Sequence, residues 1–159
     1  EKNKTDPISY YGRTKLLAEK YIIKELKNSD SLFCIGRIFS TANQNQKKNY
    51  LIPDLNKKIK GSKKKITLCN LNHYRDFISM KDISKIIIYF YKKKIKGIIN
   101  IASGKKIYLK DIALCISNYY KKDIIFKDNI KQTYLIANVN KLKKTYKKNI
   151  SINLNEFIF

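Results

Sequence analysis

The sequence predicts an α/β fold, because segments with helical spacing of apolar residues alternate with short apolar segments typical of strands. The 159 residues are 43% hydrophobic, which is enough for one domain to bury a core. Residues 31–39 are apolar almost throughout. Such a run favours a parallel sheet that is covered on both faces.

The first third of the chain predicts a helix, a strand and a loop. The helix is expected over residues 9–27, where apolar side chains recur at helical spacing and a polar segment follows. The strand over residues 31–39 comes next. Residues 40–49 are polar and without periodicity, so we expect a loop long enough to carry function. The apolar stripe of the helix comprises Leu16, Leu17, Ala18, Tyr21, Ile22 and Leu26.

The middle third predicts two helices separated by two strands. A short helix is expected over residues 50–59, with a glycine soon after it. Residues 66–69 and 74–78 are expected to be short strands around a turn. Ser79 and Asp82 have the spacing of a capping box, which predicts the start of the second helix. The buried face of that helix is expected to carry Ile83, Ile86, Ile87 and Phe90.

The last third continues the alternation of strands and helices. Strands are expected over residues 97–102 and 124–126, and helices over residues 108–120 and 139–146. Asn138 is a candidate cap for the last helix. No internal repeat interrupts this order.

Tyr11 and Lys15 are the candidate catalytic pair, because a spacing of four residues places both on one face of a helix. A tyrosine phenol, with an ordinary pKa of about 10, works as an acid/base near neutral pH only when a nearby positive charge favours the phenolate. Such a pair suits carbonyl–alcohol chemistry. The spacing alone is weak evidence in a chain rich in lysine and tyrosine. A second pair, Tyr89 and Lys93, lies in an apolar run and is expected to pack.

The net charge of +23 raises the possibility of a nucleic-acid-binding module. Only three of the 35 basic residues are arginines, although arginine is the preferred contact for phosphates and base edges. The lysines are also spread along the whole chain. We therefore expect a solvated lysine surface with weak, salt-sensitive binding to polyanions and no specific nucleic-acid partner.

The cysteines and the histidine predict neither a metal site nor a disulfide. Cys34, Cys69 and Cys115 are far apart and form no C-x-x-C motif, as in a reduced cytoplasmic protein. His73 has no companion ligands and is expected to lie in a loop. The sequence shows no signal peptide and no apolar run near the roughly 20 residues that span a bilayer, so no membrane partner is expected.

Five short motifs follow one another in a fixed order. They are Pro7-x-Ser9-x-Tyr11-Gly12-x-Thr14-Lys15-x-x-x-Glu19, Arg37-Ile38-Phe39, Leu51-Ile52-Pro53, Arg75-Asp76-Phe77-Ile78 with Asp82 behind it, and Asn100-Ile101-Ala102-Ser103-Gly104. In this order and spacing the chain resembles the second half of an extended short-chain dehydrogenase/reductase of the NAD-dependent epimerase/dehydratase family, whose members modify nucleotide sugars. The tail Asn138-Val139-Asn140-Lys141-Leu142 resembles the closing segment of that family.

The resemblance implies the C-terminal part of a Rossmann-like doubly wound parallel sheet plus a small α/β substrate-binding region. Residues 1–159 would form a single partial domain. Residues 1–48 would be the end of the Rossmann-like half with the Tyr-x-x-x-Lys helix. Residues 49–159 would be mostly the substrate-binding region, with strands that return to the sheet.

The resemblance also implies which residues meet the cofactor, NAD or NADP. Tyr11 would be the catalytic acid/base and would lie against the cofactor. Lys15 would favour the phenolate and hydrogen-bond the nicotinamide ribose. Phe39 would lie beside the nicotinamide.

A nucleotide-diphosphate sugar would be bound by Ser40, Leu51 and Arg75. Leu51 would line the nucleotide-sugar pocket, and the planar guanidinium of Arg75 would hold the diphosphate. Ser40 stands where the family often has asparagine, which leaves the identity of the sugar open. Four further motif residues are expected to be structural, in turns and caps: Asp76, Asp82, Asn100 and Gly104.

The expected function is that of a nucleotide-sugar epimerase, dehydratase or 4-ketoreductase, a homodimer in its full-length form. The family holds the dinucleotide on a glycine-rich turn. The five glycines here, at positions 12, 36, 61, 97 and 104, form no such motif. The chain begins at Glu1 without methionine. We therefore expect a fragment that is inactive alone, and a non-enzymatic product of a truncated gene is the alternative.

Overall fold

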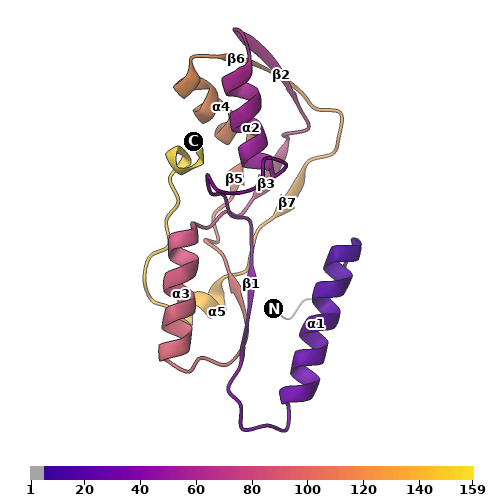
Figure 1. Cartoon of the computed structure of the whole chain (residues 1–159), viewed down its shortest axis with the longest axis vertical. Helices are drawn as coiled ribbons and strands as arrows, with labels where there is room; N and C mark the ends of the chain where they lie inside the picture. Colours follow the sequence, from indigo (N-terminus) through magenta and orange to yellow (C-terminus); the bar gives the residue numbers. More distant parts are fainter. Residues whose placement is uncertain (1–5) are drawn as a thin grey trace.

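Figure 1 shows a computed structural model of the chain, which describes residues 6–159. In chain order the elements are α1 (Tyr10–Leu26), β1 (Cys34–Ile38), α2 (Leu51–Gly61), β2 (Lys65–Cys69), β3 (His73–Arg75), α3 (Met80–Lys92), β4 (Gly97–Ile101), β5 (Ile107–Tyr108), α4 (Leu109–Tyr120), β6 (Asp123–Lys127), β7 (Thr133–Leu135), α5 (Asn140–Thr145) and the 3-10 helix η1 (Leu154–Phe157). The expected alternation of helices and strands is confirmed.

The strands pair mainly in parallel. β1 pairs with β4 and β2 pairs with β6, both in parallel. In the third sheet β3 lies between β5, which is antiparallel to it, and β7, which is parallel. This arrangement confirms the predicted α/β fold class. The turn expected between β2 and β3 exists, with Asn70 at φ 60°, but each of these strands pairs with a later segment of the chain.

Two hydrophobic cores hold the molecule together. The first contains the buried faces of α2 and α4, with Leu68 of β2 and Phe157 of η1. The second contains the buried faces of α3 and α5, with residues of β4 and the segment before α5. In α3 the buried residues are Ile83, Ile86 and Phe90. Ile87, also expected to be buried, is 50% exposed.

Of the two capping predictions, the one for Ser79 is confirmed and the one for Asn138 is wrong. Ser79 Oγ accepts the N–H of Asp82 at 3.0 Å and donates to its carboxylate at 2.9 Å, which confirms the cap of α3. At α5 the capping position belongs to Val139. Asn138 lies one residue earlier, where its Oδ1 accepts the N–H of Asn140 at 3.0 Å.

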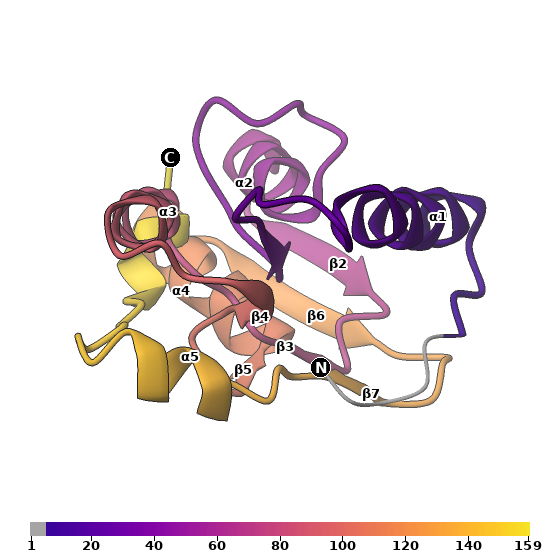
Figure 2. The ribbon, with the colours of Figure 1, turned by 90° about the horizontal axis from the view of Figure 1, so that it is seen from below.

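Helix α1 lies on the opposite side of β1 from α3 (Figures 1 and 2). None of its 17 residues is buried. Leu17 and Tyr21, which belong to the predicted apolar stripe, are 65% and 66% exposed. The helix forms as predicted, but within residues 6–159 no residue of the apolar stripe is buried.

Two short strands and η1 were not predicted, and the prediction for His73 was wrong. His73 lies in β3 and is buried, and its Nδ1 is 3.1 Å from the N–H of Thr133, which donates to it. The partner strand β7 is only three residues long, Thr133–Leu135, and all three are exposed. Such a segment has no apolar pattern by which to recognise it.

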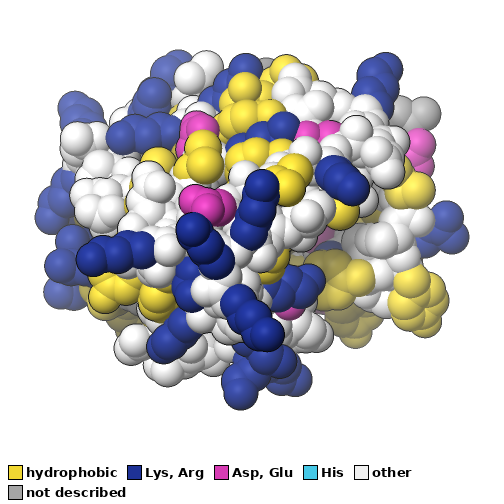
Figure 3. Space-filling model, turned by 90° about the horizontal axis from the view of Figure 1, so that it is seen from above, with side chains coloured by type: hydrophobic (Ala, Val, Ile, Leu, Met, Phe, Trp, Pro, Cys, Tyr) yellow, Lys and Arg dark blue, Asp and Glu magenta, His cyan; other side chains and the backbone are white. Residues whose placement is uncertain are grey.

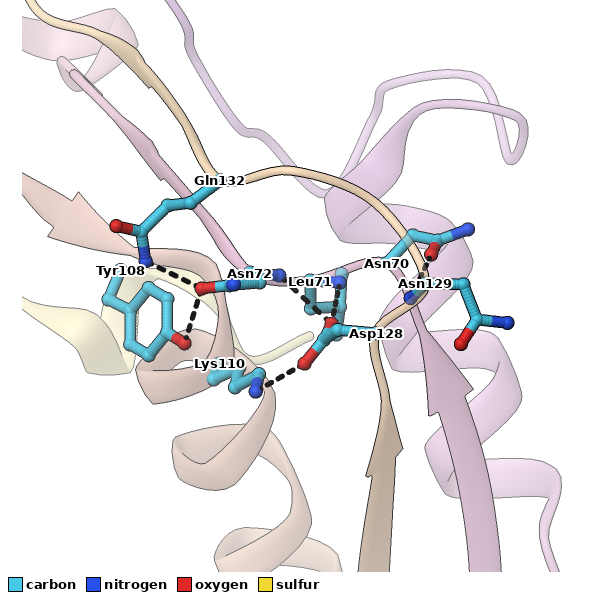
Figure 4. A network of polar contacts seen from close by, with 8 residues as sticks. All are labelled: Asn70, Leu71, Asn72, Tyr108, Lys110, Asp128, Asn129 and Gln132. Atoms are coloured by element: carbon cyan, nitrogen blue, oxygen red, sulfur yellow. Dashed lines mark hydrogen bonds and ion pairs between the residues drawn. The ribbon is translucent and has the colours of Figure 1, made fainter.

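A polar network fastens the third sheet to the pair β2–β6 (Figure 4). Asp128, just after β6, accepts the N–H groups of Leu71 and Asn72 at 3.0 and 3.2 Å and pairs with Lys110 of α4. Asn72 Oδ1 in turn accepts the hydroxyl of Tyr108. The network therefore fixes where β3 begins, and with it the position of Arg75 at its end.

Candidate active site

Tyr11 lies in the first turn of α1, and Pro7, Ser9 and Gly12 shape the entry into that turn. Ser9 caps the helix, and its Oγ accepts the N–H of Gly12 at 3.0 Å. A Cβ at Gly12 would lie 2.9 Å from Pro7 Cβ, so the lead-in passes closer to the helix than a side chain would allow. The proline–serine–glycine pattern thus sets a tight entry into the helix.

Tyr11 and Lys15 lie on the same side of α1, as the spacing predicts. The Lys15 ammonium is 5.4 Å from the centroid of the Tyr11 ring. Tyr11 is 70% exposed, so its hydroxyl can be reached from outside. In the other pair of the same spacing, Tyr89 packs edge-on against Tyr146 of the second core, as expected, whereas Lys93 is exposed.

A pocket of about 360 Å³ separates the start of α1 from β1. Lys15, Glu19 and Arg37 contribute to its lining. Arg37 holds Glu19 in a two-pronged ion pair, with one contact from Nε to Oε2 at 2.9 Å and the other from Nη2 to Oε1. This ion pair joins α1 to β1 and so orients the helix that carries Tyr11.

Phe39 and Ser40 follow β1 at its carboxyl end. The N–H of Phe39 donates to Ile101 O at 3.1 Å, which prolongs the pairing with β4. Ser40 N–H donates to Asp76 O at 3.1 Å, and Ser40 O accepts the N–H of Ile78 at 2.9 Å. These bonds fasten the loop after β1 to the segment after β3.

Arg75 ends β3 with its guanidinium held in place. Its Nη1 donates to Tyr74 O at 2.8 Å and to Thr133 Oγ1 at 3.0 Å. Partial burial lowers the pKa of Arg75 from its ordinary value. The remaining N–H groups are suited to phosphate oxygens. Leu51, the first residue of α2, is 39% exposed.

The structure brings some of the predicted residues together and keeps others apart. The N–H of Ser40 donates to the carbonyl of Asp76, the neighbour of Arg75. Ser40 and Arg75, both predicted substrate contacts, are therefore linked through one backbone hydrogen bond. Within residues 6–159, no hydrogen bond or ion pair joins Tyr11 or Lys15 to Phe39 or Ser40. The link between the two groups runs through Arg37, which lies two residues before Phe39.

Asp76 is the residue whose importance the sequence understated. Its carboxylate is 0% exposed and accepts hydrogen bonds from Ser103, Gly104 and Ala137. The structural role expected for it is confirmed. The available signal was its place beside Arg75 in a motif of four residues.

Among residues 6–159, no group of three or more His, Cys, Asp or Glu side chains is arranged to hold a metal ion. In the same range no helix has the length and apolar character needed to cross a membrane.

Residues 1–157 match the family described as GDP-mannose 4,6-dehydratase. The chain belongs to this family. The predicted kinship with nucleotide-sugar epimerases and dehydratases is thereby confirmed.

Solved structures of that kind share the fold. RMD from Pseudomonas aeruginosa, complexed with NADPH, matches with a TM-score of 0.87 and 14% identity over 98% of this chain and 56% of its own. A dTDP-glucose 4,6-dehydratase from Bacillus anthracis in complex with NAD matches with a TM-score of 0.80 and 20% identity, over 98% and 51%.

A third match is a UDP-glucuronic acid 4-epimerase from Bacillus cereus in complex with NAD, with a TM-score of 0.83 and 23% identity, over 98% of this chain and 50% of its own. The chain therefore spans about half the length of the solved structures that it matches.

Proposed function

We propose that this chain is the C-terminal part of an NAD(P)-dependent nucleotide-sugar epimerase, dehydratase or 4-ketoreductase. The observation that supports this most is the family match over residues 1–157, together with Tyr11 and Lys15 on one exposed side of α1. The solved relatives named above were complexed with NADPH or NAD.

In the proposed chemistry Tyr11 transfers the proton, and Lys15 assists from the next turn of the helix. When a sugar hydroxyl is oxidised, its proton passes to the Tyr11 oxygen while the hydride leaves from the same carbon. NAD or NADP, when bound, supplies the hydride acceptor, or the donor in the reverse direction. Lys15, whose ammonium lies 5.4 Å from the centroid of the Tyr11 ring, is assigned to a ribose hydroxyl of the cofactor. Phe39 is assigned to the face of the nicotinamide.

The proposed substrate is a nucleotide-diphosphate sugar. Arg75 is assigned to the diphosphate, because a guanidinium already anchored on one side offers its other N–H groups to oxygens. Ser40 would contact the sugar and Leu51 would line the nucleotide pocket. Ser40 forms an isolated bridge with Phe77, and Leu51 begins α2 with 39% of its surface exposed.

We further propose that the chain is inactive alone. It spans about half of its solved relatives and contains no glycine-rich dinucleotide turn. Residues 1–48 would complete a dinucleotide-binding half supplied by other residues, and residues 49–159 would hold the substrate. The complete enzyme is proposed to be a homodimer. It is also proposed to be cytoplasmic, in keeping with the free thiols of Cys34, Cys69 and Cys115.

The test is Tyr11→Phe in a fusion of this chain with the dinucleotide-binding half of a solved relative. Turnover should fall by about two to four orders of magnitude, because the phenyl ring cannot carry the proton. Nucleotide-sugar affinity, measured by isothermal titration, should stay nearly unchanged.

The matched control is Tyr10→Phe, which removes the hydroxyl of the neighbouring tyrosine, 84% exposed. This variant should turn over at the rate of the unmodified fusion. If Tyr11→Phe is as active as Tyr10→Phe, the proposed function of Tyr11 is wrong.

A further inference from the structure

Asp76 is a buried carboxylate held by neutral donors. Oδ1 accepts the N–H and the hydroxyl of Ser103 at 2.9 and 2.7 Å. Oδ2 accepts the N–H groups of Gly104 and Ala137 at 2.9 and 3.2 Å. Burying a carboxylate is unfavourable unless it is hydrogen-bonded, and the four donors provide those hydrogen bonds.

The backbone of Asp76 extends the same connection to two further segments. Its N–H donates to Leu135 O at 3.1 Å, and its carbonyl accepts the N–H of Ser40 at 3.1 Å. Ser40 lies after β1, Ser103 and Gly104 after β4, and Leu135 ends β7. One residue thus joins the ends of three strands from two different sheets.

Two residues that a nucleotide sugar is proposed to meet lie next to this junction: Ser40 after β1, and Arg75 at the end of β3. Arg75 precedes Asp76 and bonds to Thr133 of β7, whose far end Asp76 also holds. We propose that Asp76 is a positioning residue that sets the separation and orientation of Ser40 and Arg75. The sugar and its diphosphate would thereby be held in register. This inference rests on the proposed function and deepens it.

A carboxylate is required because all of its partners are donors. Asparagine has the same size but replaces one acceptor oxygen with an NH₂ group. In Asp76→Asn, the NH₂ group would face either the Ser103 donors or the N–H groups of Gly104 and Ala137. Two buried donors would lose their acceptor, and the segments that they anchor would shift.

The first experiment measures binding of GDP-mannose and of UDP-glucose to the 159-residue chain by isothermal titration. Asp76→Asn should bind the same ligand as the unmodified chain, but at least about tenfold more weakly, because misplaced groups lose paired contacts. The matched control is Asp82→Asn, the same chemical change at the cap of α3. It should stay within about twofold of the unmodified chain. Equal affinity in a folded Asp76→Asn variant would overturn the inference.

The second experiment needs no ligand. In ¹⁵N–¹H spectra, Asp76→Asn should shift the backbone N–H of Ser40 and the side-chain Nε–H of Arg75, and Asp82→Asn should leave both in place. Unshifted signals would refute the positioning role whatever the chain binds. If the spectra behave as expected but the unmodified chain binds neither sugar nucleotide, the proposed function fails and the positioning geometry stands.

A milder variant serves if Asp76→Asn does not fold. Ser103→Ala removes one of the four donors and keeps the carboxylate. It should move the same two signals in the same direction by a smaller amount. Unmoved signals in this variant would also contradict the inference.

Discussion

Gly104 is the residue at which backbone conformation and packing most restrict substitution. It has φ +74°, a conformation that residues with a Cβ rarely adopt. A Cβ there would lie 2.6 Å from Val139 Cγ2. Its N–H is also one of the donors to Asp76. Gly104→Ala should therefore lower the free energy of unfolding by about 1–3 kcal/mol, measured by urea denaturation.

Gly61 is the matched control for this prediction. It ends α2, and no atom lies within 4 Å of the position its Cβ would take. Gly61→Ala should leave stability unchanged or raise it by up to about 1 kcal/mol, because alanine restricts the unfolded chain. Equal losses at the two glycines would contradict the strain assigned to Gly104.

The ion pair between Asp128 and Lys110 should make the stability of the chain fall at both low and high pH. The hydrogen bond from Lys110 holds the pKa of Asp128 below its ordinary value of 3.8, and the backbone N–H groups of Leu71 and Asn72 add to this. A depressed pKa gives stability that is present above about 3.8 and is lost as the pH falls through the folded-state pKa. The same bond raises the pKa of Lys110 above 10.5, so its contribution is lost as the pH rises past that value.

The measurement compares the unmodified chain with Asp128→Asn by urea denaturation across pH. The stability difference should be largest between about pH 5 and pH 9 and should shrink on both sides. Asp54→Asn is the control, because its ion pair with Lys58 is exposed and such pairs contribute little. A difference that does not change between pH 7 and pH 3 would contradict the assigned role of Asp128.

At the scale of elements, the third sheet depends on a ladder of three tyrosines. Its strands have only two or three residues each. Tyr74 stacks on Tyr108 with ring centroids 4.6 Å apart, and on Tyr134 with centroids 5.0 Å apart. Cross-strand aromatic pairs stabilise sheets that are too small to rely on backbone bonds alone.

Tyr134→Ala should therefore lower the free energy of unfolding by about 0.5–1.5 kcal/mol, although the side chain is 56% exposed. Tyr134→Phe keeps the stacked ring and should retain most of the stability. Thermal unfolding followed by circular dichroism measures both. Similar losses in the two variants would assign the effect to the hydroxyl instead of the stack.

The sequence predicted the longer elements because their periodicity is local. Helices α3 and α4 follow from the spacing of isoleucine and leucine, and β1 and β4 from continuous apolar runs. Strands β5 and β7 could not be predicted, since a strand of two or three residues exists only through its partner. The burial of His73 has the same cause, because it depends on β7 lying beside β3.

The candidate site could be predicted one residue at a time but not as an arrangement. The Tyr11–Lys15 face follows directly from helical spacing. The network around Asp76 could not be foreseen, because its donors lie 27, 28 and 61 residues away along the chain. Only the folded chain brings β4 and β7 to the end of β3.

At the scale of the molecule, the surroundings of β1 are incompletely covered. Helix α1 buries no residue, and in the part of the chain that the structure describes β1 pairs only with β4. A groove of about 720 Å³ lies between β1 and α3, with Leu32, Ile38 and Ile87 in its lining. These three side chains are 48–50% exposed. Large apolar surface of this kind favours a partner, and the proposed partner is a dinucleotide-binding half.

The positive charge of the chain, in contrast to its apolar groove, does not indicate a particular partner, because the charged side chains are spread widely. Lysine and arginine side chains are scattered over the face in Figure 3, with apolar side chains between them. Such a surface matches a solvated lysine coat better than a dedicated nucleic-acid groove, since a binding face would gather its charges along one track.

The apolar surface left exposed around β1 and the missing glycine-rich turn lead to one prediction about the cofactor. Isothermal titration of the isolated chain with NAD should show no stoichiometric binding, because the pyrophosphate site lies on the turn that this chain lacks. Addition of a separately produced dinucleotide-binding half should restore binding. It should also slow hydrogen exchange in α1 by covering the helix, while exchange in α4 stays unchanged. Tight binding of NAD by the isolated chain would show that residues 1–159 contain a complete cofactor site, and the division of labour proposed above would then be wrong.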